Sequence, residues 1–170
     1  MDIQLRKAEY WQKAVLRNLM ELYSYDFSVI EGDDVDEFGL FGYRYLDHYW
    51  TEAGRYPYLV KVDGVLVGFV LLREGTYFDQ LAEEYPFPPM KVTEFFVLRK
   101  YRRKGVGRYV AREVFNRYPR RWEVAQVVND VEAQAFWRRI IDEYTHGQFE
   151  EHFLNDANWH GPVLIFDNSL

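Results

Sequence analysis

A basic stretch that contains two glycines follows an apolar segment near the middle of the chain. Between Arg99 and Arg108, six of the ten residues are Arg or Lys, and Gly105 and Gly107 stand one residue apart. Glycine lets an anionic group approach the main chain, and the start of a helix offers backbone N–H groups without intrahelical partners. The spacing predicts a site for the phosphates of a small ligand where a helix over 106–118 begins.

A single carboxylate lies in the apolar segment before this loop. Residues 91–98 are rich in β-branched and aromatic side chains and predict a strand in which Glu94 is the only acid. A carboxylate in a buried strand is expected to have a raised pKa, which suits a general base. Strand alternation puts Glu94 on one face with Val92 and Phe96, although a β-bulge could re-aim it. Alternatively, Glu94 faces solvent or pairs with a nearby Arg.

The elements that position these residues follow from hydrophobic periodicity. Strands are predicted at 1–8, 58–62, 65–72, 91–98, 122–128, 147–154 and 161–169, and helices at 9–27, 43–54, 106–118 and 129–144. Asp63-Gly64 is a favoured hairpin turn, and 76–90 is a long connection with three prolines. We expect a single domain over 1–170 of mixed α/β (α+β) class, with a central mixed sheet and helices on both faces.

The composition argues against several kinds of site. The net charge of −6 is unlike that of a dedicated nucleic-acid binder. The absence of cysteine removes disulfides, thiolate metal sites and a cysteine nucleophile, and the four histidines lack metal-ligand spacing. We expect no secretory signal, because the first residues lack an apolar run, and no membrane span. A cytoplasmic protein without metal, nucleic acid or membrane partners is the expectation.

The glycine loop has two alternative interpretations. Gly105 and Gly107, with Ala111 four positions later, match part of a helix-hairpin-helix motif for nucleic acid. That motif needs a helix before the glycines, where 92–98 predicts a strand. The other alternative is a basic surface loop with no ligand.

Two segments resemble a known family. FFVLRKYRRKGVGRYVAREVF looks like the acetyl-CoA loop of the GNAT-type N-acetyltransferases, in which Arg or Gln is followed by x-x-Gly-x and then Gly or Ala. Downstream, VNDVEAQAFWRRI is similar to the family's Asn-x-x-x-Ala segment that ends in Phe or Leu and then Tyr. The element order also matches over essentially the whole chain. The resemblance implies the acyl-CoA N-acyltransferase fold and acetyl-CoA as co-substrate.

The resemblance also implies roles for residues around the loop. Val97 would pair its backbone with the pantetheine arm, and the amide of Phe95 would polarise the thioester carbonyl. Arg102 is the signature basic residue. The backbone amides that would bind the pyrophosphate are those of Arg103, Lys104, Gly105, Val106, Gly107 and Arg108.

The downstream segment carries one match and one departure. Asn129 would lie beside the cofactor, while Asn129 or Asp130 could also cap the helix that follows. Trp137 stands where many members have a Tyr general acid. An indole N–H only donates hydrogen bonds, so we expect Trp137 to pack or to form a wall of the cofactor channel. The thiolate, with a pKa of about 8.5, would leave unaided or take a proton from water.

The acceptor side is not defined by a motif. In the family, the first two helices and their loop form one wall, where acidic and aromatic side chains would suit a cationic amine. The resemblance implies acetyl transfer to a primary amine of a small molecule or peptide by direct attack in a ternary complex, with a homodimer possible. A non-catalytic acyl-CoA-binding domain is the alternative. The expected wall residues are Tyr23, Tyr25, Asp26, Tyr45, His48 and Tyr49.

Overall fold

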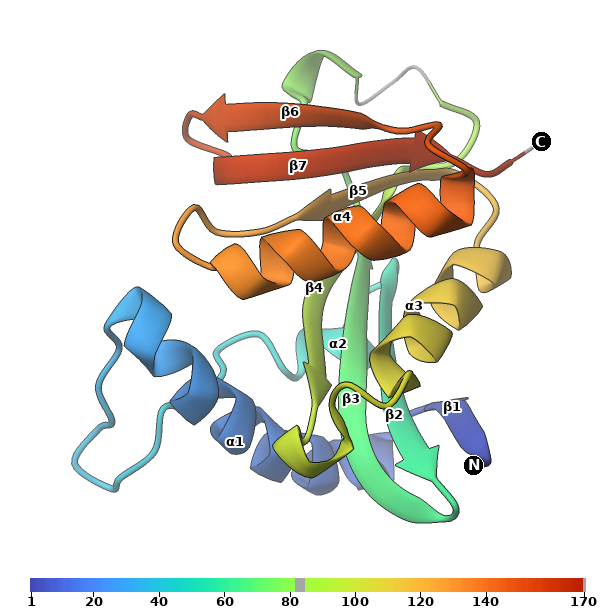
Figure 1. The fold of residues 1–170 in the computed structure, drawn as a ribbon. Helices are drawn as coiled ribbons and strands as arrows, with labels where there is room; N and C mark the ends of the chain where they lie inside the picture. Colours follow the sequence, from blue (N-terminus) through green and yellow to red (C-terminus); the bar gives the residue numbers. More distant parts are fainter. Residues whose placement is uncertain (82–84, 170) are drawn as a thin grey trace.

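The computed structural model describes residues 1–81 and 85–169 and contains one seven-stranded sheet (Figure 1). The spatial order is β1-β2-β3-β4-β5-β7-β6, and every neighbouring pair is antiparallel except β4 and β5. The expected mixed sheet is confirmed. The strands are β1 Ile3–Lys7, β2 Arg55–Val62, β3 Val65–Glu74, β4 Met90–Val97, β5 Arg121–Ala125, β6 Glu150–Asn155 and β7 His160–Asp167.

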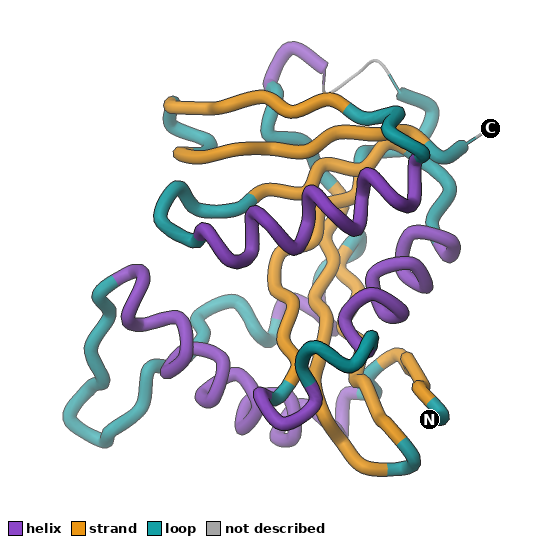
Figure 2. Tube along the Cα trace, in the orientation of Figure 1, coloured by secondary structure: helices purple, strands orange, loops and turns teal. Residues whose placement is uncertain are grey.

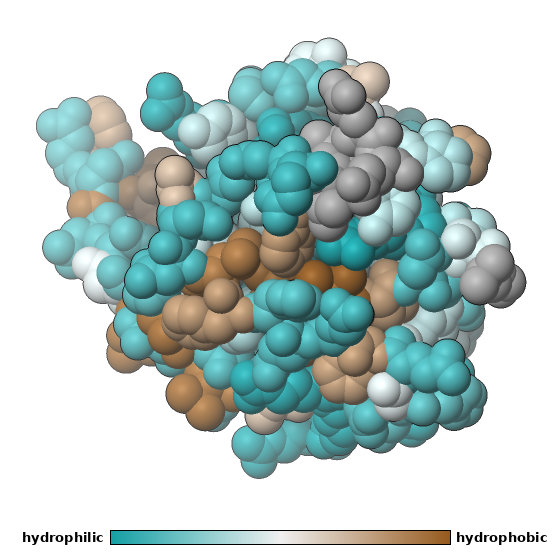
Figure 3. Space-filling model, turned by 90° about the horizontal axis from the view of Figure 1, so that it is seen from above, coloured by the Kyte–Doolittle hydropathy of each residue, from teal (hydrophilic) through white to brown (hydrophobic). Residues whose placement is uncertain are grey.

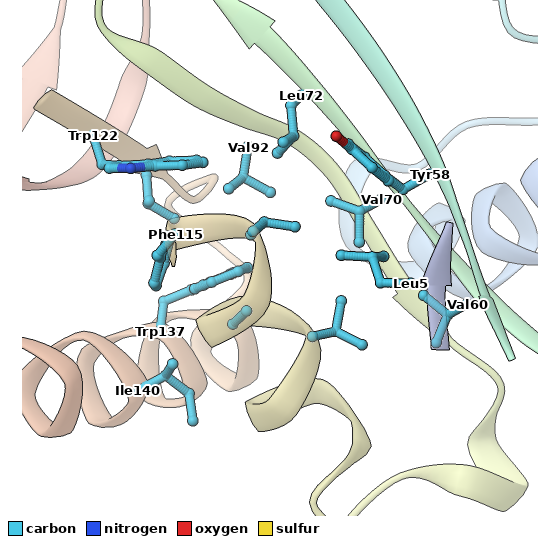
Figure 4. Packing of buried hydrophobic residues seen from close by; sticks show 14 of the residues in the cluster. Leu5, Tyr58, Val60, Val70, Leu72, Val92, Phe115, Trp122, Trp137 and Ile140 are labelled. Carbon is cyan, nitrogen blue, oxygen red and sulfur yellow. The ribbon is translucent and has the colours of Figure 1, made fainter. Parts of the chain in front are cut away.

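Helices cover both faces of the sheet, as expected (Figure 2). The helices are α1 Lys13–Glu31, α2 His48–Thr51, α3 Val106–Arg117 and α4 Val131–Thr145. One buried cluster joins α3 and α4 to the sheet through Phe115, Trp122 and Trp137 (Figure 4). A second cluster joins α1 and α2 to the opposite face through Leu16, Tyr49 and other residues. A separate apolar core therefore lies on each face of the sheet.

The predicted element bounds differ from the observed ones by a few residues at most elements, and most clearly at the first two helices. Residues 43–54 form only the short α2 preceded by turns, while the first helix extends to Glu31 and ends at Gly32, whose φ of 79° is left-handed. The hairpin turn at Asp63 and Gly64 is confirmed, with φ of 49° and 80°. The connection at 76–90 includes a short 3-10 helix, and its part at 82–84 lies outside the described residues.

The surface above the β6 end of the sheet is largely hydrophilic, with separate apolar patches (Figure 3). None of the helices in the described ranges combines the length and the apolar character that a membrane crossing requires.

The strands β4 and β5 separate soon after they meet. They pair only at Met90 with Trp122 and at Lys91 with Glu123, and Figure 1 shows β5 turning away while β4 continues beside β3. Beyond Lys91, the edge of β4 that faces β5 has no strand partner in the described ranges. An opening in the sheet therefore lies beside Phe95 and Val97.

A β-bulge changes which face of β4 each residue occupies. Leu71 pairs with Glu94 but Leu72 pairs with Val92, so Thr93 is an extra residue in the ladder. Val92 therefore lies in the α3–α4 core beside Leu72 (Figure 4), while Glu94 lies on the α1 face with Phe96. The prediction that Glu94 shares a face with Phe96 is confirmed, and the placement of Val92 with them is wrong because the bulge reverses the alternation.

Candidate active site

The loop between β4 and α3 presents a row of unpaired backbone N–H groups. In the described part of the chain, no hydrogen-bond acceptor reaches the N–H groups of residues 103–108, whereas the next N–H, of Tyr109, donates to the carbonyl of Gly105 at 3.0 Å. Arg103 and Gly105 both have positive φ, 57° and 85°, which turns the backbone into a concave path. Such a path at the start of a helix is an anion-binding geometry. We call residues 103–108 the cradle.

The two glycines of the cradle serve different needs. Gly105 has left-handed backbone geometry but open space around its missing side chain, so its requirement is conformational. Gly107 is helical, and a Cβ there would lie 3.2 Å from two ring atoms of Phe136 and 3.7 Å from the ring of Phe95. Gly107 therefore lets α3 approach α4 and β4 closely.

Three basic side chains near the cradle are engaged elsewhere. The Nε of Arg102 donates to the carbonyl of Val97 at 2.7 Å, and its Nη2 pairs with Asp26 at 2.6 Å. Arg99 also pairs with Asp26, and Arg108 pairs with Glu143 of α4 at 2.9 Å. The side chain of Arg102 thus ties the end of β4 to α1. Residues 103 and 104 are exposed, with no ion-pair partner in the described ranges.

The main-chain groups of Phe95 and Val97 lie beside the edge of β4 that has no strand partner in the described ranges. The N–H of Leu98 donates to Val67 of β3 at 2.8 Å. Alternate residues of an antiparallel strand point their N–H and C=O groups to opposite sides, so those of Phe95 and Val97 point away from β3. They face the opening, where the carbonyl of Val97 already accepts the Nε–H of Arg102 and the remaining groups could form hydrogen bonds with an extended chain.

Glu94 lies on the other face of β4, among tyrosines of the α1 side. Burial raises the pKa of Glu94 to about 7, and hydrogen bonds from Tyr23 and Tyr43 partly oppose this shift. The hydroxyl of Tyr43 lies 3.4 Å from Oε1 of Glu94. A carboxyl group with such a pKa exchanges protons near neutral pH, as a general base must.

The bulge residue extends this polar group toward α2. The hydroxyls of Tyr49 and Thr93 lie 2.7 Å apart, and the hydroxyl of Thr93 donates to the carbonyl of Leu71 at 2.9 Å. Because Thr93 and Glu94 both face α1 and α2, two consecutive residues of one strand contribute polar groups to one site. Residue alternation alone would not predict this.

A pocket of about 390 Å³ opens in front of Glu94. Of the wall residues expected from the resemblance, only Tyr23 lines it, and Tyr49 reaches the site through Thr93. Tyr25 and Tyr45 are exposed, Asp26 is held by two arginines, and His48 lies beside Glu52 of its own segment. The lining residues are Tyr23, Ser24, Phe27, Asp33, Asp34, Phe41, Gly42, Tyr43 and Glu94.

Sequence reasoning misses most of this lining. Phe41 and Tyr43 belong to a segment whose sequence predicts a loop and the start of a helix, and Asp33 and Asp34 fall among its loop residues. Tyr43 approaches Glu94 from 51 positions away, and no local motif encodes such a contact. The acidic run at 31–37 is the available signal.

Asn129 and Trp137 occupy places that differ in burial. Asp130, not Asn129, caps α4, because its carboxylate accepts the N–H of Ala133 at 3.1 Å. Asn129 is exposed in the turn before the cap. Trp137 is buried, with its ring centroid 4.9 Å from that of Phe95 in an edge-to-face contact. Trp137 therefore packs in the α3–α4 core against Phe95.

A second hollow, of about 300 Å³, lies between α4 and the β6–β7 hairpin. Its charged residues, Arg138 and Glu151, pair with each other at 2.6 Å. Within residues 1–81 and 85–169, no group of three His, Asp or Glu side chains gathers in a way that could hold a metal ion.

Several solved structures share the fold. An acetyltransferase from Thermus thermophilus aligns with a TM-score of 0.70 at 13% identity, over 98% of this chain and 97% of that one. A spermidine N-acetyltransferase from Vibrio cholerae, solved with CoA and spermine, gives 0.61 at 14% identity, over 98% and 96%. The PaiA N-acetyltransferase from Thermoplasma acidophilum, solved with coenzyme A, gives 0.61 at 11%, over 98% and 99%. These likenesses confirm the expected fold class.

No curated protein sequence gives a significant match to this chain. The model of one protein family, however, matches residues 16–141, which include most of α1, the cradle and most of α4. The family is described as the acetyltransferase (GNAT) family. The expected enzyme class is thereby confirmed at the level of the family: this chain belongs to the GNAT acetyltransferases.

Proposed function

We propose that this chain, acting as a single domain, transfers an acetyl group from acetyl-CoA to a primary amine by direct attack in a ternary complex. One observation carries the proposal. The cradle lies on the α3–α4 side of β4 and Glu94 lies on the α1 side, with the opening between β4 and β5 connecting the two sides. Donor and acceptor can therefore meet at β4 from opposite faces.

The donor side uses backbone atoms. The unpaired N–H groups of the cradle would bind the pyrophosphate of acetyl-CoA, and the free edge at Val97 would pair with the pantetheine arm. The N–H of Phe95 would donate to the thioester oxygen, where negative charge develops during attack. One such donor is typically worth about a hundredfold or more in rate. Asn129 would border the cofactor, and Trp137 would support Phe95 through their ring contact.

The acceptor side uses side chains. Glu94, as carboxylate, would take the proton of the attacking amine, directly or through a water molecule. The nitrogen then forms a bond to the thioester carbon, the carbon–sulfur bond breaks, and coenzyme A leaves as thiolate. The thiolate takes its proton from solvent, because Trp137 is not an acid. Glu94 then releases its proton to solvent, which restores the carboxylate, and the products are an acetylated amine and coenzyme A.

The first test is calorimetric titration of the protein with acetyl-CoA. We expect saturable binding that the double variant Gly105→Asp, Gly107→Asp loses, because each carboxylate repels phosphate. The matched control is Gly64→Asp, since Gly64 also has positive φ and open space around it but lies in the β2–β3 turn.

The second test follows release of the coenzyme A thiol with a panel of primary amines. Release that depends on the amine supports the proposal. Failure of the folded wild-type protein to bind acetyl-CoA would overturn it. Binding without turnover across the panel would instead indicate a non-catalytic acyl-CoA-binding domain.

A further inference from the structure

Most of the net negative charge of the chain is concentrated in one segment beside the pocket. Residues 31–43 contain five acidic residues and no basic residue, while the whole chain has 27 acidic and 21 basic residues. Without this segment the chain would have 22 acids against 21 bases, a net charge of −1. We call residues 31–43 the acidic lip. A surface charged in this way raises the local concentration of cations.

The acids of the lip differ in what they bind. The carboxylate of Asp36 accepts the N–H groups of Phe38 and Leu40, at 2.8 and 3.0 Å, and so shapes the lip itself. Asp33 and Asp34 line the pocket and have no hydrogen-bond or ion-pair partner for their side chains in the described part of the chain. These two carboxylates are available to a ligand.

The lip is fastened to α1 at the pocket. Both carboxylate oxygens of Glu21 accept backbone N–H groups of the lip, from Phe41 and Gly42, each at 2.8 Å. This contact holds the ring of Phe41 at the pocket wall. Contacts within the chain therefore shape this wall of the pocket.

Aromatic rings complete the pocket independently of the acids. Phe27 and Phe41 contribute rings without polar groups, and Tyr23 stacks on Phe27 with ring centroids 5.6 Å apart. Tyr43 contributes a fourth ring and contacts Glu94. Aromatic faces attract ammonium groups. Four rings, two unpartnered carboxylates and the half-buried Glu94 thus all favour a ligand with positive charge.

We propose that the acceptor is a small amine with a second cationic group, and that Asp33, Asp34 and the surrounding rings bind that second group. The inference rests on the proposed function, because it assigns the reacting nitrogen to Glu94. That nitrogen must lose its proton to react, so it cannot also keep the charge that the lip attracts. A separate ammonium group, a few carbon atoms away, satisfies both requirements. A pocket of about 390 Å³ is within the range of small-molecule sites.

The test compares diaminobutane with pentylamine, which replaces the second amino group by a methyl group of similar size. For the wild type we expect kcat/KM to be about tenfold higher for diaminobutane, mainly through KM. Asp33→Asn with Asp34→Asn should reduce this preference to about twofold, mainly by lowering kcat/KM for diaminobutane. Raising the salt concentration should also reduce the preference, because both acids are exposed.

The matched control is Glu31→Gln with Glu37→Gln. It removes the same charge from the lip, but neither residue lines the pocket. Retention of the preference in this control and its loss in the Asp33, Asp34 variant would establish a local subsite. Equal loss of the preference in both variants would overturn the subsite and attribute the preference to the overall negative charge of the lip.

The experiment distinguishes failure of the second-cation inference from failure of the proposed acetyl transfer. Equal kcat/KM for the two amines in the wild type would overturn the second-cation inference and leave acetyl transfer intact. If no amine is acetylated, calorimetric titration of the protein with each amine still decides. Tighter binding of diaminobutane that depends on Asp33 and Asp34 would support the subsite, and equal binding would overturn it.

Discussion

The cradle and the pocket at Glu94 lie on opposite sides of one strand. Backbone groups form the cradle, whereas side chains form the pocket. The cradle consists of consecutive backbone N–H groups at 103–108. The pocket consists of side chains from α1, the acidic lip and β4. A backbone site tolerates many side-chain changes but depends on its glycines. A side-chain site depends on the identity of each lining residue. Substitution of these residues can therefore change which ligand the site binds.

The β-bulge at Thr93 determines which residues of β4 face the cradle and which face the pocket. Because of it, Glu94 and Thr93 both face the acceptor side while Phe95 faces the cradle side. The proposed base and the proposed oxyanion donor therefore come from adjacent residues of one strand. Variants of single residues can separate the contributions of the two regions.

The largest effect is expected at the base. Glu94→Gln preserves the shape of the side chain but cannot take a proton. We expect kcat to fall by about a hundredfold to ten-thousandfold, while calorimetry shows unchanged affinity for acetyl-CoA. In the wild type, kcat should rise with pH through about 7 and then level off, since the proposed base must be in its carboxylate form. A variant that retains wild-type kcat and this pH profile would exclude Glu94 as the base.

The next largest effect distinguishes the two glycines of the cradle. Gly105→Ala places a side chain at positive φ, and Gly107→Ala places one 3.2 Å from Phe136. We expect each change to raise KM for acetyl-CoA about tenfold, with a smaller effect on kcat. The control Gly64→Ala carries similar backbone strain at φ 80°. It should lower thermal stability as Gly105→Ala does, but leave KM unchanged. A raised KM in that control would attribute the effect to stability alone.

The sequence predicts the cradle far better than the pocket, for a physical reason. The cradle needs only a strand, two glycines and the start of a helix, all close together in the chain, so local spacing identifies it. The pocket requires Tyr43 to approach Glu94, 51 residues away, and Glu21 to hold Phe41. Such contacts depend on tertiary packing, which periodicity does not encode.

Strand β4 shows where residue alternation fails to predict which face a side chain occupies. The pattern around Glu94 correctly predicts a strand and the shared face with Phe96. It cannot predict the bulge, because Thr93 is an ordinary strand residue whose irregularity arises from pairing with Leu71 and Leu72 of β3. Likewise, the helix expected at 43–54 shortens to α2, because residues 44–47 form turns and not a continuous helix.

A further prediction concerns the stability cost of Glu94. Because burial raises its pKa from 4.5 to about 7, the native state binds the proton more tightly than the unfolded state. The free energy of unfolding should therefore fall as pH rises from 4.5 to about 7, and stay level above that range, by at most about 3 kcal/mol from this group. Glu94→Gln should remove this decline. Denaturant unfolding at about pH 5 and about pH 8 would test it, and an equal effect of the variant at both values would contradict it.

A smaller effect is expected where the two regions are linked through Asp26. Its carboxylate binds Arg99 and Arg102, and Arg102 binds the carbonyl of Val97. Asp26→Asn weakens this link without touching either site. Because partly exposed ion pairs contribute little, we expect KM for acetyl-CoA to rise only about threefold, and kcat to change less. The control is Asp2→Asn, a remote surface change. A large loss of kcat alone would show that Asp26 acts on the acceptor side.

The smallest effect on catalysis is expected at Trp137, where the family often has a tyrosine acid. Its ring packs edge-to-face on Phe95 and on Phe136, with centroids 4.9 and 5.0 Å apart. Trp137→Phe keeps an aromatic ring but leaves a void, so stability should fall by about 1–2 kcal/mol. We expect kcat at a temperature well below unfolding to stay within about threefold of wild type, since a thiolate with a pKa of about 8.5 needs little help to leave. A much larger loss of kcat in a folded variant would mean that the indole N–H donates to the reacting sulfur or oxygen. The cradle side would then contribute a side chain to the chemistry, and the contrast between a backbone donor site and a side-chain acceptor site would no longer hold.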